Sequence, residues 1–125
     1  YNNGLFINFL IKKNIINTCH DVSDGGILIS LAEMCMASSL GCDVSSIKKS
    51  HSYLFGEDQA RYIISISKEK SSILKKISKE KNIFLEFLGK VNNINDTILK
   101  LPDKSYINII TLKNKSKLWF QKYIG

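Results

Sequence analysis

The chain reads His20-Asp21-Val22-Ser23-Asp24-Gly25-Gly26 between a compact apolar run, 15–19, and a long apolar segment that ends at Leu40-Gly41. This order predicts a strand, a glycine turn and a helix. The first N–H groups of a helix have no partner within the helix, and the helix dipole adds partial positive charge there. Because glycine lets the main chain come close to a ligand, the motif is typical of an anion site.

The carboxylates of this loop oppose a bare phosphate. Asp21 and Asp24 repel an anion unless a metal ion or a cationic neighbour intervenes. We therefore interpret the loop as a contact for phosphate or metal-bound phosphate, with the other ligands of the anion elsewhere. A tight turn without a ligand is the structural alternative, in which Ser23 or Asp24 caps the helix for about 1 kcal/mol. The expected phosphate-binding residues are Ser23, Asp24, Gly25 and Gly26.

A second polar motif leads into a strand pattern. The sequence Leu54-Phe55-Gly56-Glu57-Asp58-Gln59-Ala60-Arg61-Tyr62 runs into the alternating apolar and polar residues 63–67. The polar cluster 57–59 forms either a turn, with carboxylates bonded to main-chain N–H groups and to Arg61, or a wall of a cleft that faces the glycine loop. The candidate cleft-lining residues are Asp21, Glu57, Asp58 and Gln59.

Together the two motifs resemble one known family. With Ala32-Glu33-Met34 in the apolar segment between them, they are similar to the carboxy-terminal domain of phosphoribosylformylglycinamidine synthase in its bacterial synthetase-subunit form. The likeness covers most of the chain. Related aminoimidazole-ribonucleotide-synthase-like proteins, such as hydrogenase-maturation, selenophosphate and thiamine-phosphate kinase enzymes, share the glycine loop and helix. The string Gly56-Glu57-Asp58-Gln59 favours the synthase.

The resemblance implies part of an ATP- and Mg²⁺-dependent ligase of de novo purine biosynthesis. Such a ligase converts formylglycinamide ribonucleotide, ammonia from glutamine and ATP to formylglycinamidine ribonucleotide. The nucleotide-binding halves of the family lie upstream of the matching region, so we expect residues 1–125 to be a single carboxy-terminal domain, a fragment that is inactive alone and holds no cofactor tightly. Expected partners are the upstream domains, a glutaminase subunit, a small accessory subunit and the phosphorylated substrate.

No catalytic residue is expected in this chain. Histidine is the side chain that most often transfers protons in enzymes, so His20 is the candidate for proton transfer, but the resemblance places the acid–base histidine of the family upstream. A lone histidine beside a glycine loop is more often an orienting hydrogen-bond partner. The chain has no Ser-His-Asp order and no Walker-type loop, which argues against a self-contained hydrolase. The sequence leaves metal binding open.

Two other roles stay open at this point. Such synthetases are built from duplicated halves, so the glycine loop serves either an active site or a degenerate one. Alternatively, the chain is a structural module that docks a glutaminase or accessory subunit through its basic second half, or it belongs to one of the related kinase-like families.

Composition fits one globular domain in a reducing compartment. The chain has 125 residues, of which 44% are hydrophobic, enough for a core. Cys19, Cys35 and Cys42 form neither an even set nor a Cys-x-x-Cys pair, so we expect thiols, the first two buried, and neither a disulfide framework nor a zinc knuckle. We find no signal-peptide pattern and no apolar run of about 18 residues, which predicts a soluble, cytoplasmic protein.

The basic charge is confined to the second half. The formal net charge is +7, yet residues 1–60 carry four Lys against six acids, whereas residues 61–125 carry thirteen Lys and Arg61 against five acids. Readers of nucleic acid rely on arginine forks and aromatic stacking. With Arg61 as the only arginine, we expect no nucleic-acid binding, and a field that attracts phosphorylated metabolites.

The hydrophobic pattern predicts an α+β fold with a mixed sheet of about four to six strands, covered mainly on one side by helices. The expected helices are 5–10 after a loop at 2–4, 26–40 ended by Gly41, 68–81 with Ile73, Leu74 and Ile77 inward, and a closing helix with Leu118 and Trp119. The expected strands are 15–19, 42–45, 61–67, 83–91, 97–101 and 106–112, with a polar connection at 47–53 and a turn at 92–96.

Overall fold

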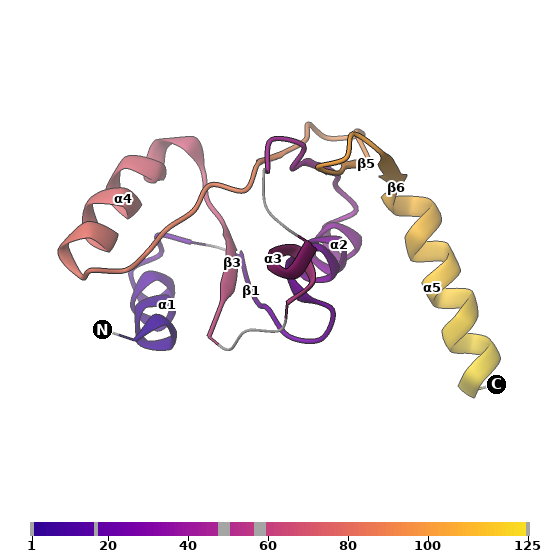
Figure 1. The fold of residues 1–125 in the computed structure, drawn as a ribbon, viewed down its shortest axis with the longest axis horizontal. Coiled ribbons are helices and arrows are strands. Elements are labelled where there is room, and N and C mark those ends of the chain that lie inside the picture. Colours follow the sequence, from indigo (N-terminus) through magenta and orange to yellow (C-terminus); the bar gives the residue numbers. More distant parts are fainter. Residues whose placement is uncertain (1, 17, 48–50, 57–59, 125) are drawn as a thin grey trace. The chain divides into compact units, whose positions relative to one another are not determined.

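The computed structural model describes residues 2–16, 18–47, 51–56 and 60–124. Its contacts divide the chain into two compact units, and Figure 1 shows the elements of both. Unit 1 comprises Tyr1–Ser30 and Ser52–Phe87, and unit 2 comprises Leu31–His51 and Leu88–Gly125. Helix α2, Gly26–Ser38, contributes residues to both. The interpretation of the chain as one carboxy-terminal domain stays a prediction.

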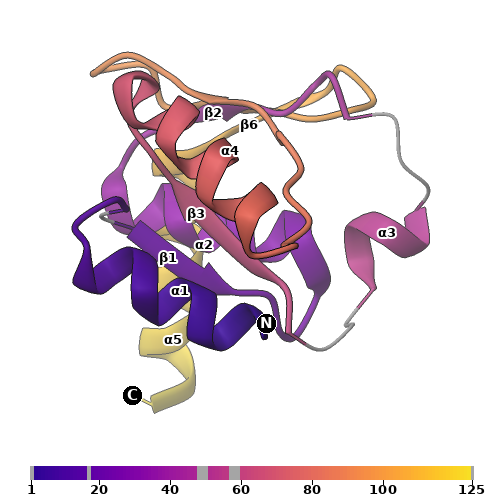
Figure 2. The ribbon, with the colours of Figure 1, turned by 90° about the vertical axis from the view of Figure 1, so that its left-hand side faces the viewer.

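Unit 1 is a two-stranded antiparallel ribbon packed with helices. Its elements are α1 (Asn3–Lys12), β1 (Thr18–Asp21), the start of α2, most of α3 (His51–Phe55), β3 (Tyr62–Ser65), the 3₁₀ turn η1 (Lys68–Lys70) and α4 (Ser71–Glu80). Strands β1 and β3 pair with Thr18 opposite Ser65 and Asp21 opposite Tyr62. In Figure 2 helices α1 and α4 lie in front of this ribbon. Pairing of β1 with β3 therefore brings together two motifs that are far apart in the sequence.

The core of unit 1 forms between α1, α4 and the ribbon. Phe6 and Leu10 of α1 are 2% and 0% exposed, and they cluster with Ile16 and Leu74. Ile64 of β3 packs against this cluster. The predicted apolar spacing is confirmed for Phe6, Phe9 and Leu10, whereas Leu5 of the same pattern is 56% exposed. The loop predicted at 2–4 is wrong, because the side chain of Asn2 accepts a hydrogen bond from the N–H of Leu5 at 3.1 Å and the helix begins at Asn3.

Unit 2 contains a four-stranded mixed sheet and α5 (Ile109–Ile124). The strands lie in the order β4 (Lys90–Val91), β2 (Cys42–Asp43), β5 (Ile98–Lys100) and β6 (Tyr106–Asn108). Strand β2 runs parallel to β5 and antiparallel to β4, and β6 runs antiparallel to β5. The predicted α+β class and mixed sheet are confirmed, with β1 and β3 forming a separate ribbon.

Several predicted strands are shorter than expected. Of 83–91, only Lys90–Val91 pairs as a strand. Strand β2 stops at Asp43, whose carboxylate accepts hydrogen bonds from the Ser45 N–H at 3.0 Å and from the Ser45 hydroxyl. The last strand ends at Asn108, because its side-chain oxygen accepts from the N–H groups of Ile110 at 3.0 Å and Thr111 at 3.3 Å. This cap starts α5 where the sequence predicted strand.

Two helical predictions also need correction. The polar connection predicted at 47–53 contains the start of α3, although residues 48–50 lie outside the described part of the chain. In α4, Leu74 is buried as predicted and Ile77 packs against the core, but Ile73 is 50% exposed and Ser78 is buried instead. The Ser78 hydroxyl donates to the Lys75 carbonyl at 2.9 Å, which satisfies it there.

Gly41 does not cap α2 as predicted. Ser39 takes the left-handed conformation after the helix, with φ of 56°. Gly41 instead lies against the main chain of β5, where an added Cβ would come within 2.0 Å of the Ile98 carbonyl oxygen. The N–H of Gly41 donates to the Asp96 carbonyl at 3.0 Å. Glycine is therefore required by a close approach of two strands, which the sequence pattern around it does not reveal.

Among the described residues, no helix has the length and apolar composition that a membrane crossing requires.

Candidate functional site

The ribbon of unit 1 brings the ends of the two sequence motifs together. Asp21 is the register partner of Tyr62, and the N–H of Val22 donates to the Arg61 carbonyl at 2.9 Å. The glycine loop therefore follows β1 at the same end of the ribbon where Arg61 leads into β3. Glu57, Asp58 and Gln59 lie outside the described residues, so their place in a cleft wall stays a prediction.

A tight turn shapes the glycine loop. The N–H of Gly26 donates to the Ser23 carbonyl at 3.1 Å, which closes the turn just ahead of α2. Gly25 and Gly26 have φ of 82° and 75°, a conformation that residues with a Cβ rarely adopt. Both glycines are thus required by the backbone. Since the Gly26 N–H bonds within the turn, an anion at this loop would rely on other groups.

Gly26 also has a packing role that the sequence did not predict. It is buried, and an added Cβ would come within 2.6 Å of the Phe55 carbonyl carbon and 2.7 Å of the Leu54 carbonyl oxygen. The atoms that crowd Gly26 are main chain at the end of α3. At Gly25, by contrast, the added Cβ would meet the side chain of Ile29, at 2.5 Å from its Cγ1. The only hint in the sequence was that Leu54-Phe55 opens the second motif.

The polar side chains of the loop lie on the surface. The side chain of Asp21 is 73% exposed, and Ser23 and Asp24 are exposed as well. His20 is 26% exposed, and its Nδ1 lies 2.6 Å from the Asp21 carbonyl oxygen and 4.0 Å from the Asp21 carboxylate. With its hydrogen on Nδ1, the imidazole donates to that carbonyl and is held in one orientation. The exposed atoms of Asp21, Ser23 and Asp24 are available to a ligand.

Arg61 holds the main chain around α3. Its Nη1 donates to the Tyr53 carbonyl at 3.2 Å and its Nη2 donates to the Gly56 carbonyl. Its guanidinium carbon lies 5.8 Å from the centre of the Tyr53 ring, in cation–π range. Arg61 therefore sets the path of the chain just before 57–59. The carboxylates predicted to bond to Arg61 belong to residues 57–59, which lie outside the described part of the chain, so that contact stays a prediction.

Tyr53 and Glu86 complete this arrangement and were missed by the sequence analysis. The Tyr53 hydroxyl donates to the Glu86 carboxylate at 2.5 Å. Burial, together with the hydrogen bond and the negative charge of Glu86, raises the pKa of Tyr53 to about 12. No spacing rule connects the two residues, because they meet only through the tertiary structure of unit 1.

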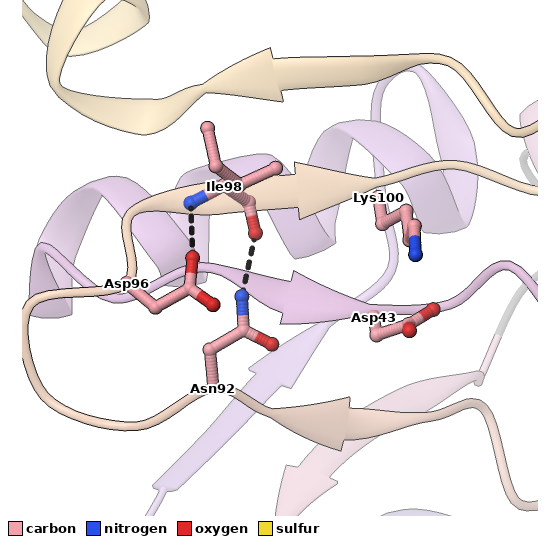
Figure 3. Close-up of a pocket in the computed structure, with 5 residues that line it drawn as sticks. All are labelled: Asp43, Asn92, Asp96, Ile98 and Lys100. Atoms are coloured by element: carbon pink, nitrogen blue, oxygen red, sulfur yellow. Dashed lines mark hydrogen bonds between the residues drawn. The ribbon is translucent and has the colours of Figure 1, made fainter.

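Unit 2 has a separate polar pocket of about 250 Å³, which Figure 3 shows. Its lining residues are Asp43, Asn92, Asp96, Ile98 and Lys100. The Asn92 amide donates to the Ile98 carbonyl at 2.7 Å, and the Asp96 carboxylate accepts from the Ile98 N–H at 3.2 Å. The hydrogen bonds from Ser45 are the main cause of a lowered pKa at Asp43. These polar groups hold the turn before β5, so their contacts have a structural explanation.

Within the described residues, no group of three or more His, Cys, Asp or Glu side chains is arranged to hold a metal ion. Fold and site together define an α+β protein in which a strand–glycine-turn–helix motif meets the approach to a second strand at one end of an antiparallel ribbon. Among the described residues, this site exposes polar atoms of Asp21, Ser23 and Asp24.

Residues 5–101 match the family described as AIR synthase related protein, C-terminal domain, and the chain belongs to this family. The resemblance inferred from the two motifs is therefore confirmed.

Similar proteins are named phosphoribosylformylglycinamidine synthase subunit PurL. The Bartonella bacilliformis protein is 37% identical over 125 residues, which covers 98% of this chain and 17% of the relative. The Pelagibacter ubique protein is 39% identical over 129 aligned residues, with the same coverages. The Azorhizobium caulinodans protein is 48% identical over 67 residues, covering 51% of this chain and 9% of the relative. The chain thus spans less than a fifth of the length of these relatives.

Solved structures share the fold. T. maritima PurL complexed with ATP matches with a TM-score of 0.67 and 16% sequence identity, covering 84% of this chain and 20% of that chain. T. maritima PurL complexed with FGAR matches with a TM-score of 0.65 and 15% identity, covering 84% and 19%. Both matches support the α+β architecture described above.

Proposed function

We propose that this chain is the carboxy-terminal domain of an ATP-dependent carbon–nitrogen ligase of the PurL type. The complete enzyme would convert formylglycinamide ribonucleotide, ammonia and ATP to formylglycinamidine ribonucleotide in purine synthesis. The observation that carries the proposal is the alignment along 98% of the chain, at 37% and 39% identity, with two proteins named as PurL. The docking-module and kinase-like alternatives are not favoured by these relatives.

The proposed role of the glycine loop is to complete a phosphate-binding cleft. Its exposed hydroxyl and carboxylates belong to Ser23, Asp24 and Asp21, on the loop that follows the ribbon end where Asp21 pairs with Tyr62. Gly25 and Gly26 contribute by giving the turn its left-handed backbone. The proposed binding residues are Ser23, Asp24, Gly25 and Gly26, with Asp21, Glu57, Asp58 and Gln59 lining the cleft.

We propose that this chain supplies only some of the ligands for ATP-bound Mg²⁺. Mg²⁺ commonly binds one or two carboxylates and takes its remaining oxygens from water and substrate phosphates. The exposed carboxylates of Asp21 and Asp24 could supply such ligands, and the described residues offer no larger metal cluster. When bound, the ion would neutralise phosphate charge during phosphoryl transfer. The role of this chain would be to keep these two carboxylates exposed at the turn.

The other parts of the reaction are assigned to other polypeptide segments. We propose that the upstream domains of the synthetase supply the catalytic residues, that a glutaminase subunit and a small accessory subunit supply ammonia, and that the complex works in the cytoplasm. His20 orients the loop in this proposal, since its Nδ1 faces the Asp21 carbonyl at 2.6 Å. The chain alone is expected to be inactive.

Removal of exposed loop groups from the full-length synthetase tests the proposal. Asp24→Asn and Ser23→Ala are expected to lower kcat/KM for formylglycinamide ribonucleotide by about tenfold each, because each removes a ligand contact from an exposed site. Glu80→Gln, at an equally exposed position at the end of α4, is the matched control and should leave kcat/KM unchanged. Gly26→Glu is unsuitable, because it would disrupt packing against α3.

The outcomes separate the site from the function. Full kcat/KM in both loop variants, with normal folding, would overturn the ligand role of the loop and leave the enzyme assignment intact. A full-length protein that makes no formylglycinamidine ribonucleotide from its three substrates would overturn the assignment itself.

A further inference from the structure

Two buried thiols of unit 2 lie in direct contact. Cys35 is in the second half of α2 and Cys42 begins β2, and each is 6% exposed. The Sγ atom of Cys35 donates to the Sγ atom of Cys42 at 3.6 Å. The third thiol, Cys19, is half-buried on β1 of unit 1. The fold therefore places one close pair of cysteines within unit 2, which the odd count of cysteines in the sequence does not reveal.

The two sulfur atoms need only a small movement to form a disulfide bond, although each cysteine is held in its own element of secondary structure. Cys42 lies in a strand that pairs on both sides, opposite Val91 of β4 and Leu99 of β5. Cys35 is separated from it by the end of α2 and by the left-handed Ser39. A disulfide bond is about 2.05 Å long, so the two sulfur atoms would need to approach by about 1.5 Å from their separation of 3.6 Å. Rotation about the Cα–Cβ bond of a cysteine moves its sulfur atom by distances on this scale.

We propose that Cys35 and Cys42 are a modification site that closes to a reversible intramolecular disulfide in the presence of a low-molecular-weight disulfide. Closure would join the last turns of α2 covalently to the central strand pair of the four-stranded sheet. Because both thiols are buried, exchange proceeds through brief local opening. The hydrogen bond between the thiols, followed by burial, raises the pKa of Cys42, whereas the same hydrogen bond lowers the pKa of Cys35.

The chemistry is thiol–disulfide exchange. The thiolate of one cysteine attacks a sulfur of the small disulfide, which forms a mixed disulfide and releases one small thiolate that takes up a proton. The second cysteine loses its proton and attacks the protein sulfur of the mixed disulfide, so that the Cys35–Cys42 bond forms and the second small thiol leaves. Two protein thiols are oxidised, and one small disulfide is reduced to two thiols.

The test uses the full chain and oxidised glutathione in buffers of defined redox poise. Remaining thiols are alkylated, and intact mass spectrometry then measures the loss of two hydrogen atoms relative to the reduced chain. Cleavage with cyanogen bromide after Met34 and Met36 assigns the bond. A Cys35–Cys42 bond keeps the dipeptide 35–36 on fragment 37–125, a Cys19–Cys35 bond keeps it on fragment 1–34, and a Cys19–Cys42 bond joins the two large fragments.

The expected result is an excess of about 100-fold of the Cys35–Cys42 bond over either other pairing in the folded chain. In urea, loop closure alone favours the shorter loop by only about three- to fivefold. An excess in the folded chain no larger than in urea would overturn the proposal, as would a product that carries only glutathione adducts. This comparison needs no variant, so it does not depend on a substituted protein folding.

Variants provide matched controls. Cys42→Ala and Cys35→Ala should lose the internal bond and gain glutathione adducts, whereas Cys19→Ala should keep the internal bond. Reduction with glutathione should restore the starting mass. Loss of the internal bond in folded Cys19→Ala would mean that Cys19, and not the buried pair, forms the disulfide.

Discussion

Gly26 in unit 1 and Gly41 in unit 2 meet different packing demands with the same residue. Gly26 has a left-handed φ of 75° and lies against the end of α3, at main-chain atoms of Leu54 and Phe55. Gly41 is not in the left-handed region, and only the closeness of the Ile98 carbonyl requires glycine there. Sequence analysis explained the first by a ligand and the second by a helix cap. Close main-chain approach is the shared reason, and it depends on a distant segment in both units.

The largest effect is expected for Gly41→Ala. The new Cβ would lie 2.0 Å from a main-chain oxygen of β5, which cannot move without breaking the pairing of β2. We expect a loss of about 4 kcal/mol in the free energy of unfolding, measured by urea titration with circular dichroism. Ser39→Gly is the matched control, and should stabilise the chain by about 0.5 kcal/mol because Ser39 already has φ of 56°. A tolerated Gly41→Ala would contradict the close approach of β2 and β5.

Gly26→Ala is expected to cost about 3 kcal/mol, because it combines a strained left-handed φ with a clash against α3. Hydrogen exchange should show faster exchange at the start of α2, in addition to the lower free energy of unfolding. A loss below about 1 kcal/mol would mean that α3 does not pack on this glycine.

Gly25→Ala should cost less, about 2 kcal/mol, and should be partly rescued by a second change. Its added Cβ would lie 2.5 Å from the Ile29 Cγ1 and 2.9 Å from the Ile29 Cβ. Ile29 is 42% exposed, so Ile29→Ala removes the closer contact at little cost of its own and leaves the contact with Cβ. A double-mutant cycle measures the coupling free energy between positions 25 and 29. Gly26 offers no equivalent rescue, because main-chain atoms crowd it. Strictly additive effects would contradict the contact with Ile29.

The smallest effect is expected at Tyr53, which is in α3, the helix whose end packs against Gly26. Its pKa is raised to about 12 when folded, against about 10 when unfolded, so the folded state retains the proton more strongly. This stabilisation is present below pH of about 10 and is lost as the pH rises through about 12. Tyr53→Phe should cost about 1 kcal/mol at neutral pH and should flatten the fall in stability between these pH values relative to the unsubstituted chain. Parallel curves for the two proteins would contradict the hydrogen bond to Glu86.

Local sequence patterns predicted the structure correctly where interactions between neighbouring residues decide it. The apolar spacing of Phe6 and Leu10 predicted α1, and the Asn-rich segment 92–96 predicted the turn before β5. Predictions failed where a local pattern competed with a side chain or a distant strand. The apolar residues after Asn108 suited a strand, but its side-chain oxygen captured two N–H groups and began a helix. Residues 83–89 have the composition of a strand but pair with no other strand among the described residues.

In the candidate site, too, the features that depend on neighbouring residues could be predicted, and those that depend on distant segments could not. The glycine turn, the exposed acids beside it and the family could be inferred from two short motifs, because turns and caps depend on residues three or four positions apart. The main-chain carbonyl of Tyr53 as a partner of Arg61, and the pair of Tyr53 with Glu86, could not be inferred from the sequence.

By itself the sequence determined the family, the order of most elements and the need for glycine at the turn before α2, because these depend on local backbone chemistry and on motifs that survive as strings of residues. Only the tertiary structure decided which main chain approaches Gly26 and Gly41, and that Cys35 meets Cys42 while Cys19 does not share their unit. These contacts arise when segments far apart in the chain pack together, and no local pattern records which segments will meet.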